Sequence, residues 1–212
     1  MKRFVFAVVS LLVLLLWQGR ASAHPHTWIE FDIRVTFDDQ GRVTGLHQTW
    51  LFDAYYTMFV VEGAEKLTGA EQQDALNALL AENLKNLAEY RYFTHIYSGE
   101  TPLETKIAEN TATRMAGDRL EMSFFLPLAE PVEARELAVS YQIYDPTYYV
   151  EMLHYKGKDS ITLDGAAGCQ AKLIEANPDP SETLYASSLA QSETGYDGLG
   201  KLFAETATIR CG

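Results

Sequence analysis

The chain has 212 residues, a length that suits one domain with a sizeable core. Its net charge at pH 7 is −12. A surface of that sign repels nucleic acid and anionic lipid, which argues against proteins that bind either. The chain carries no Gly-x-Ser-x-Gly, His-Glu-x-x-His or phosphate-cradling glycine loop. The sequence therefore predicts a protein that is not an enzyme.

The first 23 residues have the pattern of a cleavable secretory signal peptide. Two basic residues precede an apolar run over residues 4–17, and Ala-Ser-Ala at residues 21–23 is a small-x-small cleavage site. The apolar run is shorter than the about 20 residues of a transmembrane helix. We therefore expect a periplasmic protein with a single domain over residues 24–212; an uncleaved membrane anchor is the alternative. The signal holds three of the 17 basic and none of the 29 acidic residues, so cleavage takes the net charge from −12 to −15.

Cleavage after residue 23 would place a metal-binding sequence at the new N-terminus. His24-Pro25-His26 then offers three nitrogen ligands, namely the α-amine and two imidazoles. Imidazole suits zinc, copper and nickel. Pro25 lacks an amide proton, which excludes a square-planar copper site built on backbone amides. A chelate formed by the α-amine and the His24 ring, known as a histidine brace, keeps copper open as a second metal.

A β-hairpin is predicted over residues 25–52. Apolar and polar residues alternate from residue 25 to residue 37, as in a half-buried strand, and Asp38 to Gly41 form a turn. A four-residue loop pairs His47 with Asp32 and Asp53 with His26, about 5 Å apart at Cβ. The residues that share one polar face are then His24, His26, Asp32, His47 and Asp53.

Imidazoles with a carboxylate are a plausible zinc ligand set, so this polar face is a candidate metal site. Three other interpretations stay open. The first histidines can belong to a frayed terminus, and His47 can be an ordinary surface or core histidine. Asp53 can simply cap the helix that follows it.

The rest of the chain predicts an α+β fold with a largely antiparallel β-sheet or sandwich. A short helix is expected within residues 53–66, and a long one from residue 68 to about residue 90. A further helix begins at Asp179-Pro180. Strands are expected at residues 91–97, 103–115, 120–126, 137–143, 148–155, 160–163, 172–175 and 203–211.

Two further features bear on the site. Cys169 and Cys211 are the only cysteines, and in an exported chain they predict one disulfide; a two-thiolate metal site is the alternative. Asp145 lies at a turn among tyrosines, where it either supplies a carboxylate to the metal or belongs to a packed sheet end. Surface or packing roles are expected for His154, and a structural role for His95.

Four segments together resemble a bacterial periplasmic family of unknown function, often described as the periplasmic component of an ABC-type transport system. They are HPHTWI at 24–29, TWLFD at 49–53, YRYFT at 90–94 and YDPTYY at 144–149. Genes of this family commonly lie beside NicO-type permeases, and members have been tied to zinc acquisition.

The resemblance implies a periplasmic metal-handling partner of an inner-membrane permease, with Zn²⁺ favoured over Ni²⁺, Co²⁺ or Cu²⁺. It marks His24, His26, Asp53 and Asp145 as motif positions only. An Asp-rich, calcium-loop-like stretch of many relatives is missing at residues 62–68, so calcium binding is not expected. The competing classes are a binding module that holds an organic ligand with Tyr and Trp residues, and a copper-brace oxidative enzyme.

Overall fold

The computed structural model describes residues 25–156, 159–165, 168–190 and 192–212. The predicted signal peptide, its cleavage site and His24 lie outside these residues. Within them, no helix combines the length and the apolar character needed to cross a membrane.

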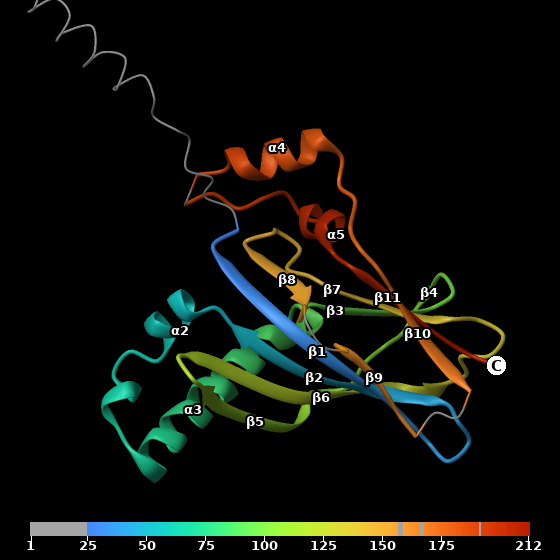
Figure 1. The fold of residues 1–212 in the computed structure, drawn as a ribbon, viewed down its shortest axis with the longest axis horizontal. Coiled ribbons are helices and arrows are strands. Elements are labelled where there is room, and N and C mark those ends of the chain that lie inside the picture. Colours follow the sequence, from blue (N-terminus) through green and yellow to red (C-terminus); the bar gives the residue numbers. More distant parts are fainter. Residues whose placement is uncertain (1–24, 157–158, 166–167, 191) are drawn as a thin grey trace, which may run out of the picture.

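Two β-sheets form the body of the molecule, and most of their strand pairs are antiparallel (Figure 1). The first sheet contains β5 (Glu109–Ala116), β6 (Arg119–Val132), β2 (Val43–Phe52), β1 (Thr27–Phe37) and β8 (Val150–His154), with β9 (Ile161–Asp164) also paired to β1. The second sheet contains β10 (Cys169–Ile174), β11 (Thr206–Cys211), β7 (Val139–Ile143), β3 (Thr94–Ser98) and β4 (Thr101–Pro102). Among the strands of the described residues, only β8 and β9 run parallel to their neighbour β1. The predicted α+β class is confirmed.

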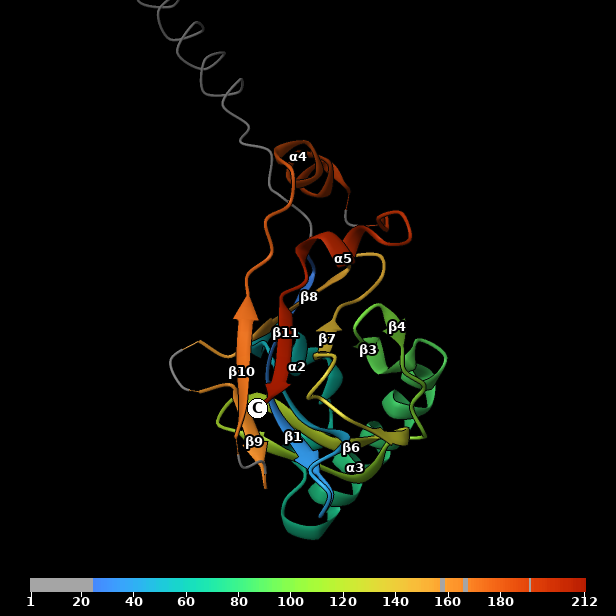
Figure 2. The same ribbon diagram turned by 90° about the vertical axis from the view of Figure 1, so that its right-hand side faces the viewer.

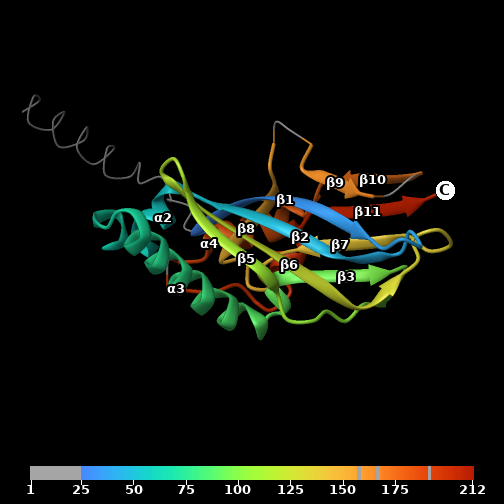
Figure 3. The same cartoon turned by 90° about the horizontal axis from the view of Figure 1, so that it is seen from below.

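The helices lie at the two ends of this body. They are α2 (Ala54–Val60), α3 (Gly69–Ala88), α4 (Pro180–Ser188) and α5 (Leu199–Phe203), with short 3-10 turns η1 (Ala64–Lys66) and η2 (Arg91–Phe93). The long helix α3 runs beside β5 and β6, as seen from below in Figure 3. Helix α4 stands at the opposite end, beyond α5 (Figure 2).

One large apolar core lies between the two sheets and under α3. The predicted alternation along β1 is confirmed, because Ile29, Phe31, Ile33 and Val35 are all buried. They pack with Tyr141, Ile143 and Ile209 of the second sheet. Three leucines on one side of α3 complete the core at the other end; they are Leu76, Leu80 and Leu84.

The predicted register of the first hairpin is wrong by two residues. His47 pairs with Arg34 and not with Asp32. The loop spans residues 38–42, because Phe37 pairs with Val43, and a β-bulge near residue 44 adds a further shift. The Asp38 amide donates to the Arg42 carbonyl oxygen at 2.9 Å across this loop. A shift of two residues preserves the side-chain alternation, so the predicted buried and polar faces are still correct.

The predicted strand over residues 91–97 begins later than expected. Residues 91–93 form the 3-10 turn η2, and all three have positive φ angles, of 55°, 53° and 54°. None of them is glycine, so this left-handed backbone is strained. Hydrogen bonds hold it in place: the Thr94 hydroxyl donates to the Tyr92 carbonyl oxygen at 2.8 Å, and the Tyr144 amide donates to that of Phe93 at 2.9 Å.

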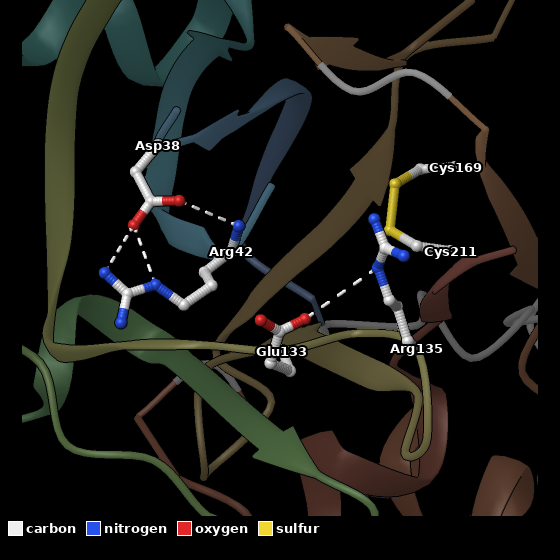
Figure 4. Close-up of a disulfide and its surroundings, with 6 residues drawn as sticks. All are labelled: Asp38, Arg42, Glu133, Arg135, Cys169 and Cys211. Atoms are coloured by element: carbon white, nitrogen blue, oxygen red, sulfur yellow. Dashed lines mark hydrogen bonds and ion pairs between the residues drawn. A yellow bond between two sulfur atoms is a disulfide. The ribbon is translucent and has the colours of Figure 1, made fainter. Parts of the chain in front are cut away.

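The predicted disulfide between Cys169 and Cys211 is present (Figure 4). The two cysteines are direct partners in the pairing of β10 with β11. In the same view, Asp38 accepts hydrogen bonds from the backbone and guanidinium of Arg42, which closes the first hairpin loop. The disulfide is compatible with an extracellular or periplasmic location.

Candidate functional site

His26 is held at the start of β1 rather than in a frayed end. Its backbone amide donates to the carbonyl oxygen of Tyr149 at 2.9 Å. Its ring lies against the Tyr149 ring, with 4.6 Å between the ring centroids. The Nε2 atom of His26 is enclosed by protein. Pro25, which precedes His26, is the first described residue, so the predicted ligands of residue 24 lie outside the structure's described part.

His47 does not join His26 in one site. It faces Arg34 on β1, and eight residues along that strand, about 26 Å at 3.3 Å per residue, separate Arg34 from His26. Burial, together with the charge of Arg34, lowers the pKa of His47. The predicted hairpin site therefore does not form as one cluster.

Asp53 is the N-cap of α2, the alternative left open by the sequence. Its Oδ1 accepts a hydrogen bond from the Tyr56 amide at 2.8 Å. Its Oδ2 accepts one from the Trp28 amide at 3.0 Å, while its own amide donates to the Trp28 carbonyl oxygen at 2.9 Å. Both carboxylate oxygens are thus engaged in joining α2 to the start of β1.

We expect Asp53→Ala to lower the free energy of unfolding by about 1–2 kcal/mol, because a helix cap and a tie to β1 are lost. Asp53→Asn should cost much less, since asparagine caps helices as well as aspartate does. Urea unfolding measures both. Zinc affinity should be the same in the Asn variant as in the wild type; an Asn variant of normal stability that binds zinc more weakly would make Asp53 a ligand.

Asp145 organises the loop before β8. It is 7% exposed. Its Oδ1 accepts from the amide and hydroxyl of Thr147 at 2.9 and 3.0 Å, and its Oδ2 accepts from the Val150 amide at 3.0 Å. A β-carbon at Gly200 would overlap the Asp145 carbonyl oxygen, so this loop packs closely on α5. The geometry favours the packed sheet end over a free carboxylate.

Among residues 25–212 without the masked gaps, no three His, Cys, Asp or Glu side chains gather closely enough to hold a metal ion.

A buried polar network that the sequence did not reveal joins the two sheets. The carboxylate of Glu205 accepts hydrogen bonds from the backbone amide of His154 at 2.7 Å and from its ring Nδ1 at 2.8 Å. The other ring nitrogen of His154 lies 2.9 Å from the Tyr141 hydroxyl. His154 is 3% exposed and Glu205 6% exposed. His154 therefore packs inside the protein, as predicted, and does so through hydrogen bonds.

Burial and hydrogen bonds together determine which groups of this network are ionised. Burial would raise the pKa of Glu205, but hydrogen bonds from His154 and the charge of that ring outweigh this effect and lower it. Burial, with the nearby Glu205 charge, raises the pKa of Tyr141 well above its ordinary value. The carboxylate is therefore ionised and the phenol neutral at neutral pH.

His95 is part of the sheet surface near α5. Its ring stacks on Tyr144, with 4.3 Å between centroids and 13° between planes. Burial, with the charges of Arg91 and Lys201, lowers the pKa of His95 to about 4. His95 is therefore neutral at neutral pH, in keeping with the structural role predicted for it.

An apolar cavity of about 280 Å³ lies between the inner face of the first sheet and helix α3. Its buried floor is formed by Thr27, Ile29, Trp50, Phe52 and Met122. Its walls and mouth are formed by Tyr56, Asn83, Asn86, Leu87, Phe93, Tyr149 and Val150. Tyr149 thus separates the cavity from the ring of His26.

The fold and these sites define an α+β protein of two antiparallel-rich sheets, with a histidine fixed at the start of its first strand and an apolar cavity beside it. The chain belongs to the family described as "Protein of unknown function (DUF1007)", whose model matches residues 9–211.

Two relatives show the extent of this similarity. An "Uncharacterized protein" of Haemophilus influenzae is 33% identical over 211 residues, which cover 95% of this chain and 98% of the relative. An "Uncharacterized 15.5 kDa protein in trpE 3'region" of Spirochaeta aurantia is 33% identical over 99 residues, 45% of this chain and 68% of the relative.

Proposed function

We propose that the protein is a periplasmic metal-binding accessory protein of a transition-metal transport system. It would pass Zn²⁺ to or from an inner-membrane permease, of the NicO type that the family resemblance implies. The metal would be held at the exported N-terminus by the α-amine and ring of His24 and by the ring of His26. Ni²⁺, Co²⁺ and Cu²⁺ are the alternative metals.

The observation that carries this proposal is the fixed position of His26. Pairing with Tyr149 through the backbone and through the ring orders this histidine before any metal arrives. An ordered ligand loses less conformational entropy on binding than a frayed one. Since Nε2 is enclosed, Nδ1 would be the ligating nitrogen. The disulfide and the acidic composition suit an exported protein that meets cations.

The proposed ligand set also suits transfer rather than a structural role. Three nitrogen ligands from His24 and His26 leave a zinc coordination position open, whereas structural zinc sites are closed by four protein ligands. An open position lets a ligand of the permease replace one from this protein. Asp53 and Asp145 are left out of the set, because both oxygens of each carboxylate already accept hydrogen bonds.

We expect His26→Ala to weaken zinc binding at least about tenfold in the mature protein, as one of three ligands is lost. His47→Ala is the matched control, since it removes a histidine about 26 Å from the site, and its affinity should equal that of the wild type. Calorimetric titration with Zn²⁺ measures both. Binding should weaken in acid, because imidazole must be unprotonated to bind a metal.

A second comparison tests the α-amine. One glycine placed before His24 moves the amine away from the ring, and it should also weaken binding about tenfold or more. If His26→Ala and the extended protein both bind zinc as the wild type does, the N-terminal site is wrong. If only His47→Ala weakens binding, the ligands lie on the far part of the hairpin.

A further inference from the structure

We propose that the apolar cavity beside His26 is a binding site for a small, uncharged, aromatic molecule. This site is separate from the proposed metal site, and the inference does not rest on the proposed function. It follows from the chemistry of the lining, the arrangement of the aromatic rings and the backbone strain around the cavity.

The lining excludes a charged ligand. Among the described residues, none of those that line the cavity is Asp, Glu, Lys, Arg or His. Burying an unpaired charge in such surroundings is very costly. Burial, with the charges of Asp53 and Tyr149, raises the pKa of Tyr56, so this wall residue is also neutral. The volume of about 280 Å³ is close to the lower limit for small-molecule sites.

Aromatic side chains from several segments line the cavity and favour a flat ligand. Phe52 and Tyr56 stack on one another with 5.3 Å between centroids, and Phe93 and Tyr149 come from other segments. Trp50 offers carbon alone, since its indole N–H already donates to the Gln48 side chain at 3.0 Å. Flat rings stack or meet edge to face with such partners.

A few polar groups would orient the ligand. Asn83 is half-buried and Asn86 exposed, one turn apart on α3, and both line the cavity. An asparagine amide both donates and accepts hydrogen bonds. A carboxamide or hydroxyl on the ligand would match these two side chains, while its ring would occupy the apolar floor.

The backbone around the cavity is strained. Phe93 belongs to the left-handed turn η2, and Tyr148, directly before the wall residue Tyr149, has φ of 58°. Strained residues of this kind gather at functional sites. Their position around the cavity supports a binding role for it.

Naphthalene-2-carboxamide is a suitable probe, and 2-naphthylmethylamine is its positively charged counterpart. Titration calorimetry and saturation-transfer NMR on the mature protein measure binding. We expect the neutral probe to bind at least about tenfold more tightly than the amine. The protein's negative charge favours the amine in solution, so a preference for the carboxamide reports on the cavity itself.

Two variants locate the binding. Leu87→Trp places an indole in the cavity from α3 and should abolish binding of the carboxamide. Asn83→Ala removes an orienting amide and should weaken binding about three- to tenfold, with little risk to folding. Asn77→Ala is the matched control, because Asn77 is exposed on the same helix and does not line the cavity.

The inference is overturned if the wild type binds neither probe, if it binds the amine as tightly as the carboxamide, or if Leu87→Trp and Asn83→Ala bind like the wild type. Zinc titration of the same variants keeps the two proposals apart. Loss of probe binding with normal zinc affinity concerns the cavity alone, and the reverse result concerns the N-terminal metal site alone.

Discussion

Replacing Glu205 with alanine is expected to lower the free energy of unfolding by about 2–5 kcal/mol, because two buried donors would lose the carboxylate that accepts their hydrogen bonds. The carboxylate accepts hydrogen bonds from both the backbone amide and the ring of His154. Both donors would stay buried without this acceptor, and buried donors that lack a partner are costly. Urea unfolding followed by circular dichroism measures the change.

Glu104→Ala is a matched control for this variant. The Glu104 carboxylate forms an ion pair with the Arg91 guanidinium at 3.5 Å. Unlike Glu205, its side chain is 74% exposed. Exposed pairs contribute little, so the free energy of unfolding should change by less than about 1 kcal/mol. An equal decrease in the free energy of unfolding in the two variants would show that burial does not strengthen the contribution of Glu205.

The pH dependence of stability gives a second measure of Glu205. Its pKa is lowered in the folded protein from an ordinary value of 4.5. The folded state then binds fewer protons than the unfolded state, so this contribution is complete above pH 4.5 and is lost as the pH falls through the folded pKa. Glu205→Gln should make the unfolding free energy less dependent on pH in that range than it is in the wild type.

The faces of the first hairpin were predictable from sequence, but its pairing was not. Alternation of apolar residues shows which side chains share a face of a strand. It does not show which residues pair across two strands, because that register depends on the turn and on bulges. The longer loop closed by Asp38 and Arg42, followed by a bulge, moved His47 from Asp32 to Arg34. An error of two residues kept every side chain on its predicted face. Even in the predicted pairing, His47 lay opposite Asp32, about 20 Å along the strand from His26 at 3.3 Å per residue, so a shared face was not enough to make one site.

Local sequence patterns could not predict features that depend on contacts between residues far apart in the sequence. His154 and Glu205 are 51 residues apart, and no local spacing relates them. Residues 91–93 were expected to begin a strand, but they form a left-handed turn that is held by hydrogen bonds from Tyr144 and Thr94. Asp53, in contrast, has a role that its neighbours in the sequence determine. The sequence left open that it caps the following helix, and the structure shows this cap.

Removing the disulfide through the double change Cys169→Ser and Cys211→Ser is expected to lower the free energy of unfolding by about 4 kcal/mol. The bond closes a loop with a sequence separation of 42. Closing a loop of this length lowers the conformational entropy of the unfolded chain, which stabilises the folded state by about 4 kcal/mol. Strand β10 lies at the edge of its sheet and pairs with β11 alone, so its pairing should open first.

Urea unfolding with and without dithiothreitol tests this expectation. The reductant should lower the stability of the wild type to that of the double variant and leave the variant unchanged. Thiol labelling of the denatured, unreduced wild type should find no free cysteine. Two free thiols, or a wild type whose stability is the same before and after complete reduction, would contradict the prediction. Loss of stability with a metal chelator alone would favour the two-thiolate metal site over the disulfide, because a chelator leaves a sulfur–sulfur bond intact.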